Sequence, residues 1–248
     1  MADCFPTIHF VVIPTDFDEG FPNMWFGSKK AHYLVGTKLL QDKAKKNQHS
    51  HFPLSGLILR PSFHKTLQKD KGVQKTQLGL RPDQPVALIM FGGYGDKMML
   101  KIAQGLTAHY PHLQCIFICG HHKKLYHQIQ KISSSRPWCV VEFTKDIFHY
   151  MRAADFFIGK PGPGCISEAI DQRLPVLVQT GWTTLLQEKA VVEWIERKQL
   201  GLSFHNFRDL LSKIKTMLDH LDFFQRNVSK VPENKAVFES LTLLKKFL

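Results

Sequence analysis

The chain has 248 residues, of which 44% are hydrophobic and 22% charged, a composition that excludes disorder over most of its length. Its 33 lysine and arginine residues exceed the 21 aspartate and glutamate residues and give a formal net charge of +12. This charge predicts an anionic partner, and the candidates are a membrane surface, which we favour, a nucleic acid or a phosphorylated small molecule. The aromatic and basic residues do not alternate as in a single-strand binding platform, so we expect no nucleic acid partner.

Five cysteines without a C-x-x-C pair predict buried, reduced thiols in an intracellular protein. Cys119, His121 and His122 are too close in sequence for a zinc site, and no metal is expected. No apolar run reaches the roughly 20 residues of a membrane span. The start, MADCFPTIHF, also lacks the segments of a secretory signal. Any membrane contact is therefore expected to be peripheral.

The N-terminal part predicts short strands at residues 8–13, 32–35 and 57–59 and a helix at residues 38–46. Asp16 follows the first strand, at the end where open α/β sheets place ligand-contacting groups, although a turn-forming aspartate is the commoner explanation. The lysine-rich segment 65–84 has few large apolar residues and is interpreted as a linker. Residues 1–64 are then a separate N-terminal unit.

Residues 85–248 alternate regularly between strands and helices, which predicts a doubly wound parallel sheet of the α/β class. The expected strands are 86–91, 115–119, 140–143, 156–158 and 176–179. The expected helices are 97–109, 123–132, 147–153, 165–173, 185–198, 207–221 and 235–247.

Two predicted strands end in glycine-rich turns, FGGYGD at residues 91–96 and GKPGPG at residues 159–164. The carboxyl ends of parallel strands open onto one edge of a sheet, so both turns can flank one ligand. A helix predicted to begin at Cys165 would present free N–H groups to an anion. Glu168, expected in its first turn, could accept both hydroxyls of a ribose. The alternative is that the glycines only make compact turns and Glu168 only stabilises a helix start.

Other nucleotide-binding patterns fit less well. The chain contains no G-x-x-x-x-G-K-[ST] loop. Gly162, Gly164 and Ser167 approach a dinucleotide fingerprint, but Gln179 and Thr180 stand where that pattern has an acid. The ligand that remains compatible with these turns is a mononucleotide bearing a diphosphate and a sugar.

The sequence resembles a known family, the inverting glycosyltransferases of two Rossmann-like domains (GT-B type) that include the diacylglycerol glycosyltransferases, among them the monogalactosyldiacylglycerol synthases. The matching segments run in the family's order over nearly the whole chain: PTDF (14–17), WF (25–26), SGLILRPSF (55–63), FGGYG (91–95), ICGHHKKL (118–125), EFTKDI (142–147), GKPGPGCISEAIDQRLPVLV (159–178) and QEKA (187–190). The resemblance implies one complete doubly wound domain that binds the UDP-sugar, residues 85–248, and a partial N-terminal Rossmann-like domain on the acceptor side, residues 1–64.

The resemblance also implies residue roles and a metal-free, cofactor-free donor site. The implied donor contacts are Gly92, Gly93, Tyr94, Gly95, Lys160, Gly162, Pro163 and Gly164 for the diphosphate, Phe143 and Thr144 for the uracil, Glu168 for the ribose, and Gln187 and Glu188 for the sugar.

The implied reaction moves galactose or glucose from UDP-galactose or UDP-glucose to diacylglycerol, with inversion, at an anionic membrane surface of the plastid envelope or the cytoplasm. Family members carry the general base in a preceding acceptor domain, and this chain begins near that domain's end. The catalytic residue is therefore unassigned, with Asp16 as the candidate in the cleft. The chain is expected to be a fragment of a full transferase, a donor-binding half that works with a separate acceptor-domain chain, or inactive.

Overall fold

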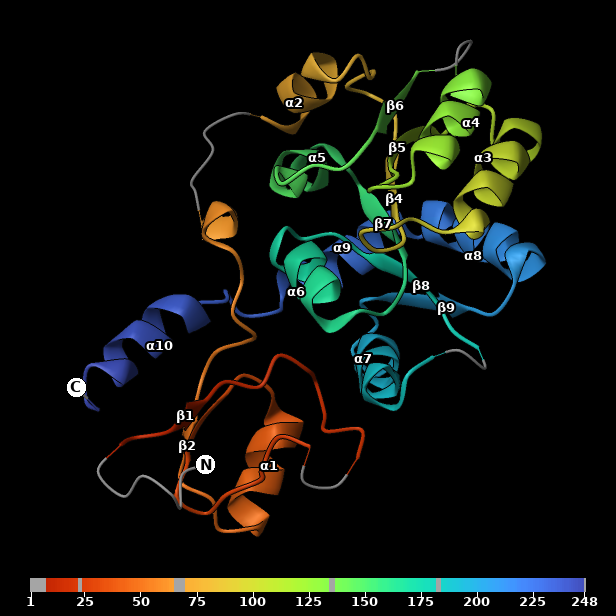
Figure 1. Ribbon diagram of the computed structural model, residues 1–248. Helices are drawn as coiled ribbons and strands as arrows, with labels where there is room; N and C mark the ends of the chain where they lie inside the picture. The colour runs from red at the N-terminus through yellow and green to blue at the C-terminus, as the bar shows by residue number, and fades with distance from the viewer. Residues whose placement is uncertain (1–7, 22–23, 65–69, 134–136, 182–183, 248) are drawn as a thin grey trace.

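The computed structural model describes residues 8–21, 24–64, 70–133, 137–181 and 184–247, which form a smaller and a larger α/β unit (Figure 1). The smaller unit contains a three-stranded parallel sheet of order β1-β2-β3. The larger unit contains a six-stranded parallel sheet of order β6-β5-β4-β7-β8-β9. Residues 1–7 of the predicted N-terminal domain and 65–69 of the predicted linker lie outside the described residues.

The strand order of the larger sheet reverses between β4 and β7. In chain order, β4 comes first and lies in the centre. The next strands, β5 and β6, lie on one side of it, and β7, β8 and β9 lie on the other. In doubly wound sheets this reversal opens a crevice at the carboxyl ends of the two central strands. The strands are β4 (Val86–Met90), β5 (Gln114–Ile118), β6 (Trp138–Val141), β7 (Phe156–Gly159), β8 (Val176–Gln179) and β9 (Gly201–Phe204).

Helices cover both faces of this sheet, and the alternating side chains of β4 show why. Val86, Leu88 and Met90 join one buried cluster, whereas Ala87 and Ile89 join the other, because successive strand residues point to opposite faces. The first cluster is completed by α5 (Ile147–Ala153), α6 (Pro163–Asp171) and α7 (Leu186–Arg197). The second is completed by α3 (Lys97–His109), α4 (Lys123–Ser133) and α8 (Phe207–Asp219), and α9 (Leu221–Ser229) contributes to both.

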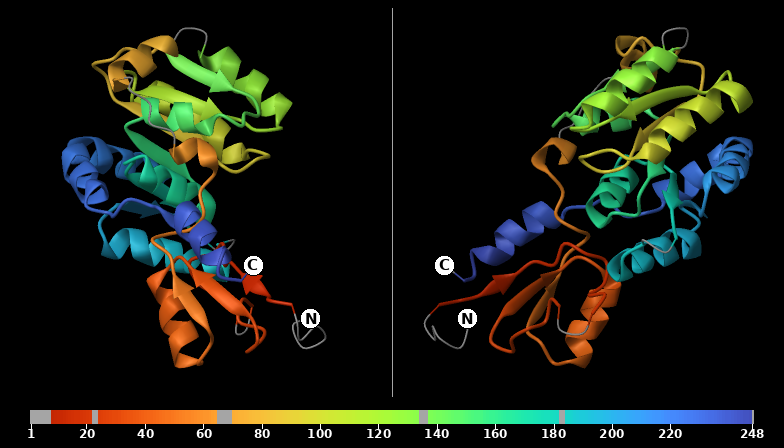
Figure 2. Two further views of the ribbon diagram at one scale, coloured as in Figure 1. Left: turned by 90° about the vertical axis from the view of Figure 1, so that its left-hand side faces the viewer. Right: turned by 45° about the vertical axis from the view of Figure 1, so that its right-hand side comes forward.

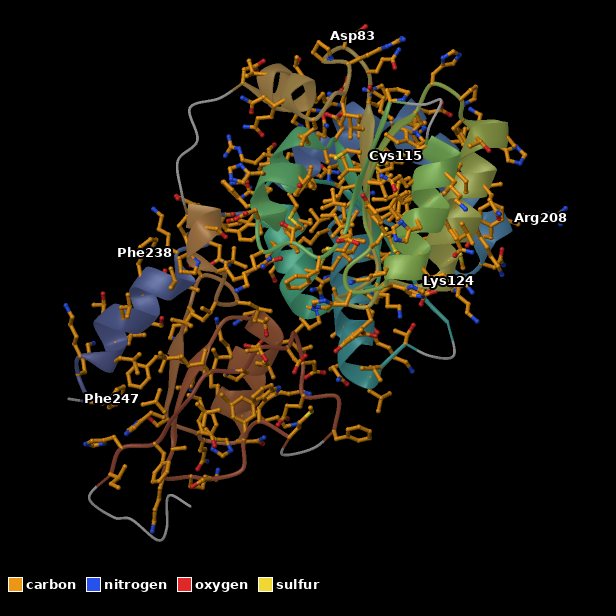
Figure 3. The ribbon with its side chains drawn as sticks, turned by 45° about the horizontal axis from the view of Figure 1, so that its top comes forward. Asp83, Cys115, Lys124, Arg208, Phe238 and Phe247 are labelled. Atoms are coloured by element: carbon orange, nitrogen blue, oxygen red, sulfur yellow. The ribbon has the colours of Figure 1, made fainter. Side chains whose placement is uncertain are left out.

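The C-terminal helix belongs to the smaller unit. Tyr33 and Val35 pack against α1 (Lys38–Lys46) on one face of the small sheet, while Leu34 packs with Ala236 of α10 on the other. Figure 2 shows α10 lying along the smaller unit, and Figure 3 places Phe238 and Phe247 there. The elements are β1 (Val11–Val12), β2 (His32–Val35), β3 (His51–Pro53) and α10 (Ala236–Leu244).

The segment predicted as a linker, residues 65–84, contains the helix α2 (Lys71–Gln77), and the 3₁₀ helix η1 (Pro61–His64) directly precedes this segment. Lys75 is only 5% exposed, and its Nζ lies 2.7 Å from Oδ2 of buried Asp155. Lys71 Nζ lies 3.2 Å from Oδ1 of the same carboxylate. These ion pairs fasten α2 to the larger unit, while the exact domain boundaries stay a prediction.

The predicted fold class is correct, and most predicted elements of the larger unit lie within a few residues of the observed ones. The strand predicted at residues 57–59 is wrong. Leu57 and Leu59 are apolar because their side chains are buried, but this segment forms no strand pairing with the described residues. The third strand of the small sheet is His51–Pro53 instead. Strand β9 and helix α9 had no sequence prediction of their own, and the predicted helix 207–221 is α8, which ends at Asp219.

Replacing Lys75 with methionine should lower the free energy of unfolding by about 3 kcal/mol, because buried Asp155 loses its shorter ion pair. Lys71→Met removes a more exposed partner of the same carboxylate and should cost ~1 kcal/mol or less. Urea unfolding curves of the two variants measure the difference. Equal losses would contradict the dominant role of Lys75.

Candidate functional site

The two glycine-rich turns lie side by side because β4 and β7 are neighbours in the sheet. Asp96, after β4, and Lys160, after β7, join the turns through an ion pair of 3.1 Å between Oδ2 and Nζ. Asp96 also caps α3 by accepting a hydrogen bond from the Met98 N–H. Burial alone would raise the pKa of Asp96, but the Met98 hydrogen bond and Lys160 outweigh it, and the pKa lies below its usual value.

The turn after β4 has a shape that needs glycine and an outer side that is open. Gly92 and Gly95 have φ angles of 76° and 63°, in the region that favours glycine. The Gly93 carbonyl accepts a hydrogen bond of 2.8 Å from His121 N–H, and a Cβ on Gly120 would lie 2.1 Å from that carbonyl oxygen. A Cβ on Gly92 or Gly93 would meet nothing within 4 Å. The backbone of this turn is therefore accessible to a ligand.

The turn after β7 leads into a helix start that has no side-chain cap. Gly162 is the N-cap of α6 and Pro163 its first residue, a position that suits proline because no intrahelical N–H bond is needed there. A Cβ on Gly162 or Gly164 would meet nothing within 4 Å. The free N–H groups and the positive end of the helix dipole therefore face open space, which suits an anionic oxygen, and Lys160 adds a positive charge nearby.

Glu168 lies deeper in the helix than its sequence suggested. Because α6 begins at Pro163 and not at Cys165, Glu168 is in the second turn, and the first turn contains no acid. The prediction of a first-turn acid stabilised by the helix dipole is therefore wrong. Glu168 is 9% exposed, and burial raises the pKa of its carboxyl group, an effect that Arg60 opposes.

Arg60 is the partner of Glu168. Its Nε donates to Oε1 at 2.8 Å and its Nη2 to Oε2 at 2.9 Å, a bidentate pair between residues 108 positions apart. Arg60 lies between β3 and η1, so the pair joins the segment leaving the smaller unit to α6 of the larger unit. The sequence analysis assigned Arg60 no role, although the residue stands out as the one charge in the matching segment SGLILRPSF.

The aromatic residues predicted at the site form an exposed edge. The ring of Phe143 stacks on that of His121 with centroids 4.0 Å apart, and Tyr94 lies 5.8 Å from the same His121 ring. Tyr94 is 80% and Phe143 49% exposed. Thr144 Oγ1 accepts a hydrogen bond from Asp146 N–H. These residues follow β4, β5 and β6 and extend the edge formed by the glycine turns.

The residues predicted to bind the sugar begin α7. Glu188 Oε2 accepts a hydrogen bond of 3.1 Å from Leu185 N–H and so stabilises the helix start. Gln187 lies close to Gly20 of the smaller unit. A Cβ atom added to Gly20 would be only 3.2 Å from the Gln187 Oε1 atom. Asp16, in the same loop of the smaller unit, is half-buried, and burial raises its pKa, an effect that the nearby Trp25 side chain opposes. The loop after β1 therefore meets the sugar end of the predicted donor site.

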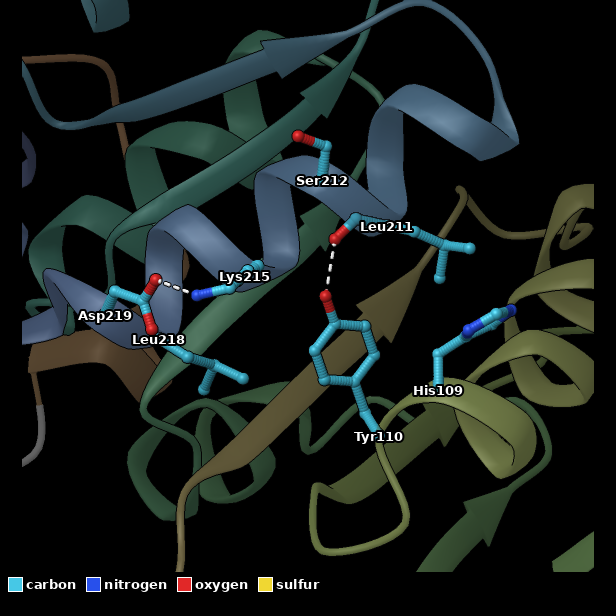
Figure 4. Close-up of a pocket in the computed structure, with 7 residues that line it drawn as sticks. All are labelled: His109, Tyr110, Leu211, Ser212, Lys215, Leu218 and Asp219. Carbon is cyan, nitrogen blue, oxygen red and sulfur yellow. Dashed lines mark hydrogen bonds and ion pairs between the residues drawn. The ribbon is translucent and has the colours of Figure 1, made fainter.

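The described part of the structure contains two hollows near these elements. One of about 750 Å³ lies between the units and is lined by Phe17, Gly36, Ser167, Asp171, Trp194 and Lys230, among others. Another of about 510 Å³ lies between the ends of α3 and α8, where Tyr110 O–H donates to the Leu211 carbonyl at 2.7 Å (Figure 4). Neither is lined by the glycine turns. The second hollow lies at the end of α3 away from the site, because α3 begins at the Gly92 turn.

Among the described residues, no group of three or more histidine, cysteine, aspartate and glutamate side chains is arranged to hold a metal ion. The expectation of metal-free chemistry stays a prediction. Within the same part of the chain, no helix combines the length and the apolar character of a membrane span.

No protein-family model matches the chain. The monogalactosyldiacylglycerol synthase of Spinacia oleracea is 31% identical to it over 245 residues, which cover 94% of this chain and 46% of the spinach sequence. The chain is a relative of the monogalactosyldiacylglycerol synthases. It spans about half the length of the synthases that match 94% of its residues.

Comparison with solved structures gives the fold. MurG of Acinetobacter baumannii superposes with a TM-score of 0.70 at 15% identity, covering 99% of this chain and 68% of MurG. Os79 of O. sativa in complex with UDP superposes with a TM-score of 0.65 at 13% identity, covering 91% of this chain and 57% of Os79. The architecture is the GT-B fold of glycosyltransferases, as predicted.

The glycine turn after β4 can be tested by stability alone. Gly120→Ala should lower the free energy of unfolding by about 1–3 kcal/mol, because a side chain there is strained at a φ of 62° and collides with the Gly93 carbonyl. Gly93→Ala enters open space and should change it by less than ~0.5 kcal/mol. Thermal and urea unfolding measure both. A neutral Gly120→Ala would show that the turn does not depend on this close approach.

Proposed function

We propose that this chain is the donor-binding part of a hexosyltransferase that moves galactose or glucose from a UDP-sugar to diacylglycerol. The observation that carries the proposal is the pair of open glycine turns at the strand-order reversal, with an uncapped helix start and a buried acid beside them. The similarity to synthases named for monogalactosyldiacylglycerol supports the sugar and the lipid. The structural similarity to Os79 in complex with UDP supports the nucleotide.

In this proposal the diphosphate binds between the two turns. The N–H groups at the start of α6 and the exposed backbone of Gly92, Gly93 and Tyr94 are fixed dipoles that need no reorganisation. Such dipoles stabilise the negative charge that develops on UDP as it leaves the sugar. Lys160, half-exposed in its ion pair with Asp96, can turn its ammonium group toward the diphosphate. These groups supply the electrostatic stabilisation that a divalent ion supplies elsewhere.

The nucleoside would lie along the aromatic edge and α6. Phe143 offers an exposed ring and Thr144 an adjacent backbone for the uracil, at the carboxyl end of β6. Glu168 offers two carboxylate oxygens to the vicinal hydroxyls of the ribose. Gln187 and Glu188 would bind the hydroxyls of the transferred sugar at the start of α7.

Catalysis would be a direct displacement at the anomeric carbon with inversion, in which a base removes the proton of the acceptor hydroxyl. Asp16 is the candidate base on this chain. Its loop meets Gln187, and its raised pKa makes its carboxylate a stronger base than a solvent-exposed aspartate. Aspartates whose pKa is raised by burial are suited to such proton transfer.

Acceptor binding would involve more than the described residues. The relatives are about twice as long as this chain, so we propose that the lipid is bound with the help of further residues, in a longer protein or on a separate acceptor-domain chain. The net charge of +12 suits peripheral contact with an anionic membrane surface. The relatives are named as chloroplastic, which supports a plastid location over a cytoplasmic one.

A second candidate is a donor-binding protein without turnover. It is favoured by the extent of the similarity, because this chain spans only about half the length of the synthases that it matches. Binding of UDP without transfer of hexose to diacylglycerol in vesicles would support this candidate.

Calorimetric titration tests the donor site. UDP should bind and NAD should not, and Glu168→Ala should weaken UDP binding by ~1–3 kcal/mol, because the ribose hydroxyls lose a buried acceptor. Gly162→Ala is expected to weaken UDP binding while leaving stability unchanged, since its side chain would occupy the space of the diphosphate. An absence of UDP binding by the folded chain would overturn the proposed function.

A further inference from the structure

Helix α10 has a fixed orientation on the smaller unit, because contacts hold it at both ends. At its start, the Asn234 side chain donates to the Leu57 carbonyl at 2.8 Å and accepts from Ala236 N–H at 3.0 Å. Just beyond its end, the Phe247 ring stacks on His32 of β2 with centroids 4.5 Å apart. One side of the helix therefore faces the small sheet, and the opposite side faces outward (Figure 2).

The outward side of α10 exposes large apolar side chains. Phe238 is 56% and Leu241 57% exposed. Their spacing of three residues, followed by four residues to exposed Lys245, places these side chains on one stripe of the helix. The Phe238 ring touches the smaller unit at one edge, where its centroid lies 5.0 Å from that of His64. Exposed apolar side chains that gather in this way mark a surface that a partner covers.

The charges of α10 are sorted between its two sides. Glu239, the one acid of the helix, is directed toward the smaller unit, where its Oε2 accepts a hydrogen bond of 2.7 Å from Ser55 N–H. Lys245 and Lys246, just after the helix, are exposed and form no ion pair with another described residue. The outward side is therefore apolar in its middle and positive at its C-terminal end.

This pattern determines which kind of partner fits. Phenylalanine and leucine beside lysine are typical of helices that lie in the headgroup region of a bilayer, where the apolar side chains enter the boundary of the acyl chains and the lysines meet lipid phosphates. A second copy of the chain would bring the same net charge of +12 and the same lysines, so charge repulsion disfavours it as the partner.

We propose that the outward side of α10 is the surface through which this chain contacts an anionic membrane, with Phe238 and Leu241 inserted and Lys245 and Lys246 next to the phosphates. The inference rests on the peripheral membrane contact proposed above and names the surface that makes it. It is independent of the donor site. Because α10 packs on the small sheet, the smaller unit would lie at the lipid, and the glycine turns of the larger unit would stay in water, where a UDP-sugar is dissolved.

Sedimentation with vesicles tests the charged end of this surface. The chain should bind vesicles of phosphatidylcholine mixed with phosphatidylserine at least about tenfold more tightly than vesicles of phosphatidylcholine alone. Lys245→Gln combined with Lys246→Gln should weaken binding to the mixed vesicles by about tenfold or more, since each lysine near an anionic surface contributes roughly fivefold. Lys123→Gln combined with Lys124→Gln is the matched control, because it removes two adjacent exposed lysines from α4, away from α10 (Figure 1), and should leave binding unchanged.

A second pair of variants tests the apolar middle. Leu241→Ser should weaken binding to the mixed vesicles by at least about fivefold, because the inserted apolar area is lost. Leu241 is more than half exposed, so the variant should fold, as circular dichroism can verify. Val73→Ser, at a position of α2 that is 47% exposed on the larger unit, should bind like the unmodified chain.

The outcomes separate this inference from the function on which it rests. If the unmodified chain binds mixed vesicles and neither the lysine variant nor Leu241→Ser weakens that binding, membrane contact stands and the α10 surface is overturned. If the unmodified chain binds no vesicles, the membrane contact and this inference both fail, while titration with UDP still decides the donor site. A dimer in light scattering that Leu241→Ser dissociates would identify a second copy as the partner and would also overturn the inference.

Discussion

The reversal of strand order between β4 and β7 is the constraint on which the site depends. It brings together two turns that are about 70 residues apart in sequence and leaves between them a crevice that no crossover connection closes. Glycine serves two purposes around this crevice. Gly95 and Gly120 permit positive φ angles and close backbone approach, whereas Gly93 and Gly162 leave space beside the chain. The ion pair between Asp96 and Lys160 holds the two turns in register.

The smaller unit is bound to the larger one by several long-range contacts. Arg60 reaches Glu168, the loop after β1 reaches Gln187, and Asn234 donates to the Leu57 carbonyl at 2.8 Å as the chain returns to form α10. These contacts place residues of both units around the ribose and sugar ends of the proposed donor site. The diphosphate of a donor bound there would contact the larger unit, and the transferred sugar would lie next to residues of the smaller unit.

Local signals made much of the fold predictable from the sequence. Helices α1, α3 and α5 were predicted with the observed bounds, and the first two begin beside capping residues, Thr37 and Asp96. Strands β3 and β9 have weaker local signals, since one ends in a proline and the other is a four-residue GLSF segment. The glycine turns were predicted because each follows an apolar strand. The contact between Arg60 and Glu168 could not be predicted, because it depends on how the two units pack.

A structure of the chain with UDP bound tests the central claim most directly. The account predicts the diphosphate at the start of α6 beside Gly92 and Gly93, and the ribose beside Glu168. A nucleotide bound elsewhere, for example in the hollow lined by Trp194 and Lys230, would contradict the assignment of the glycine turns as the donor site.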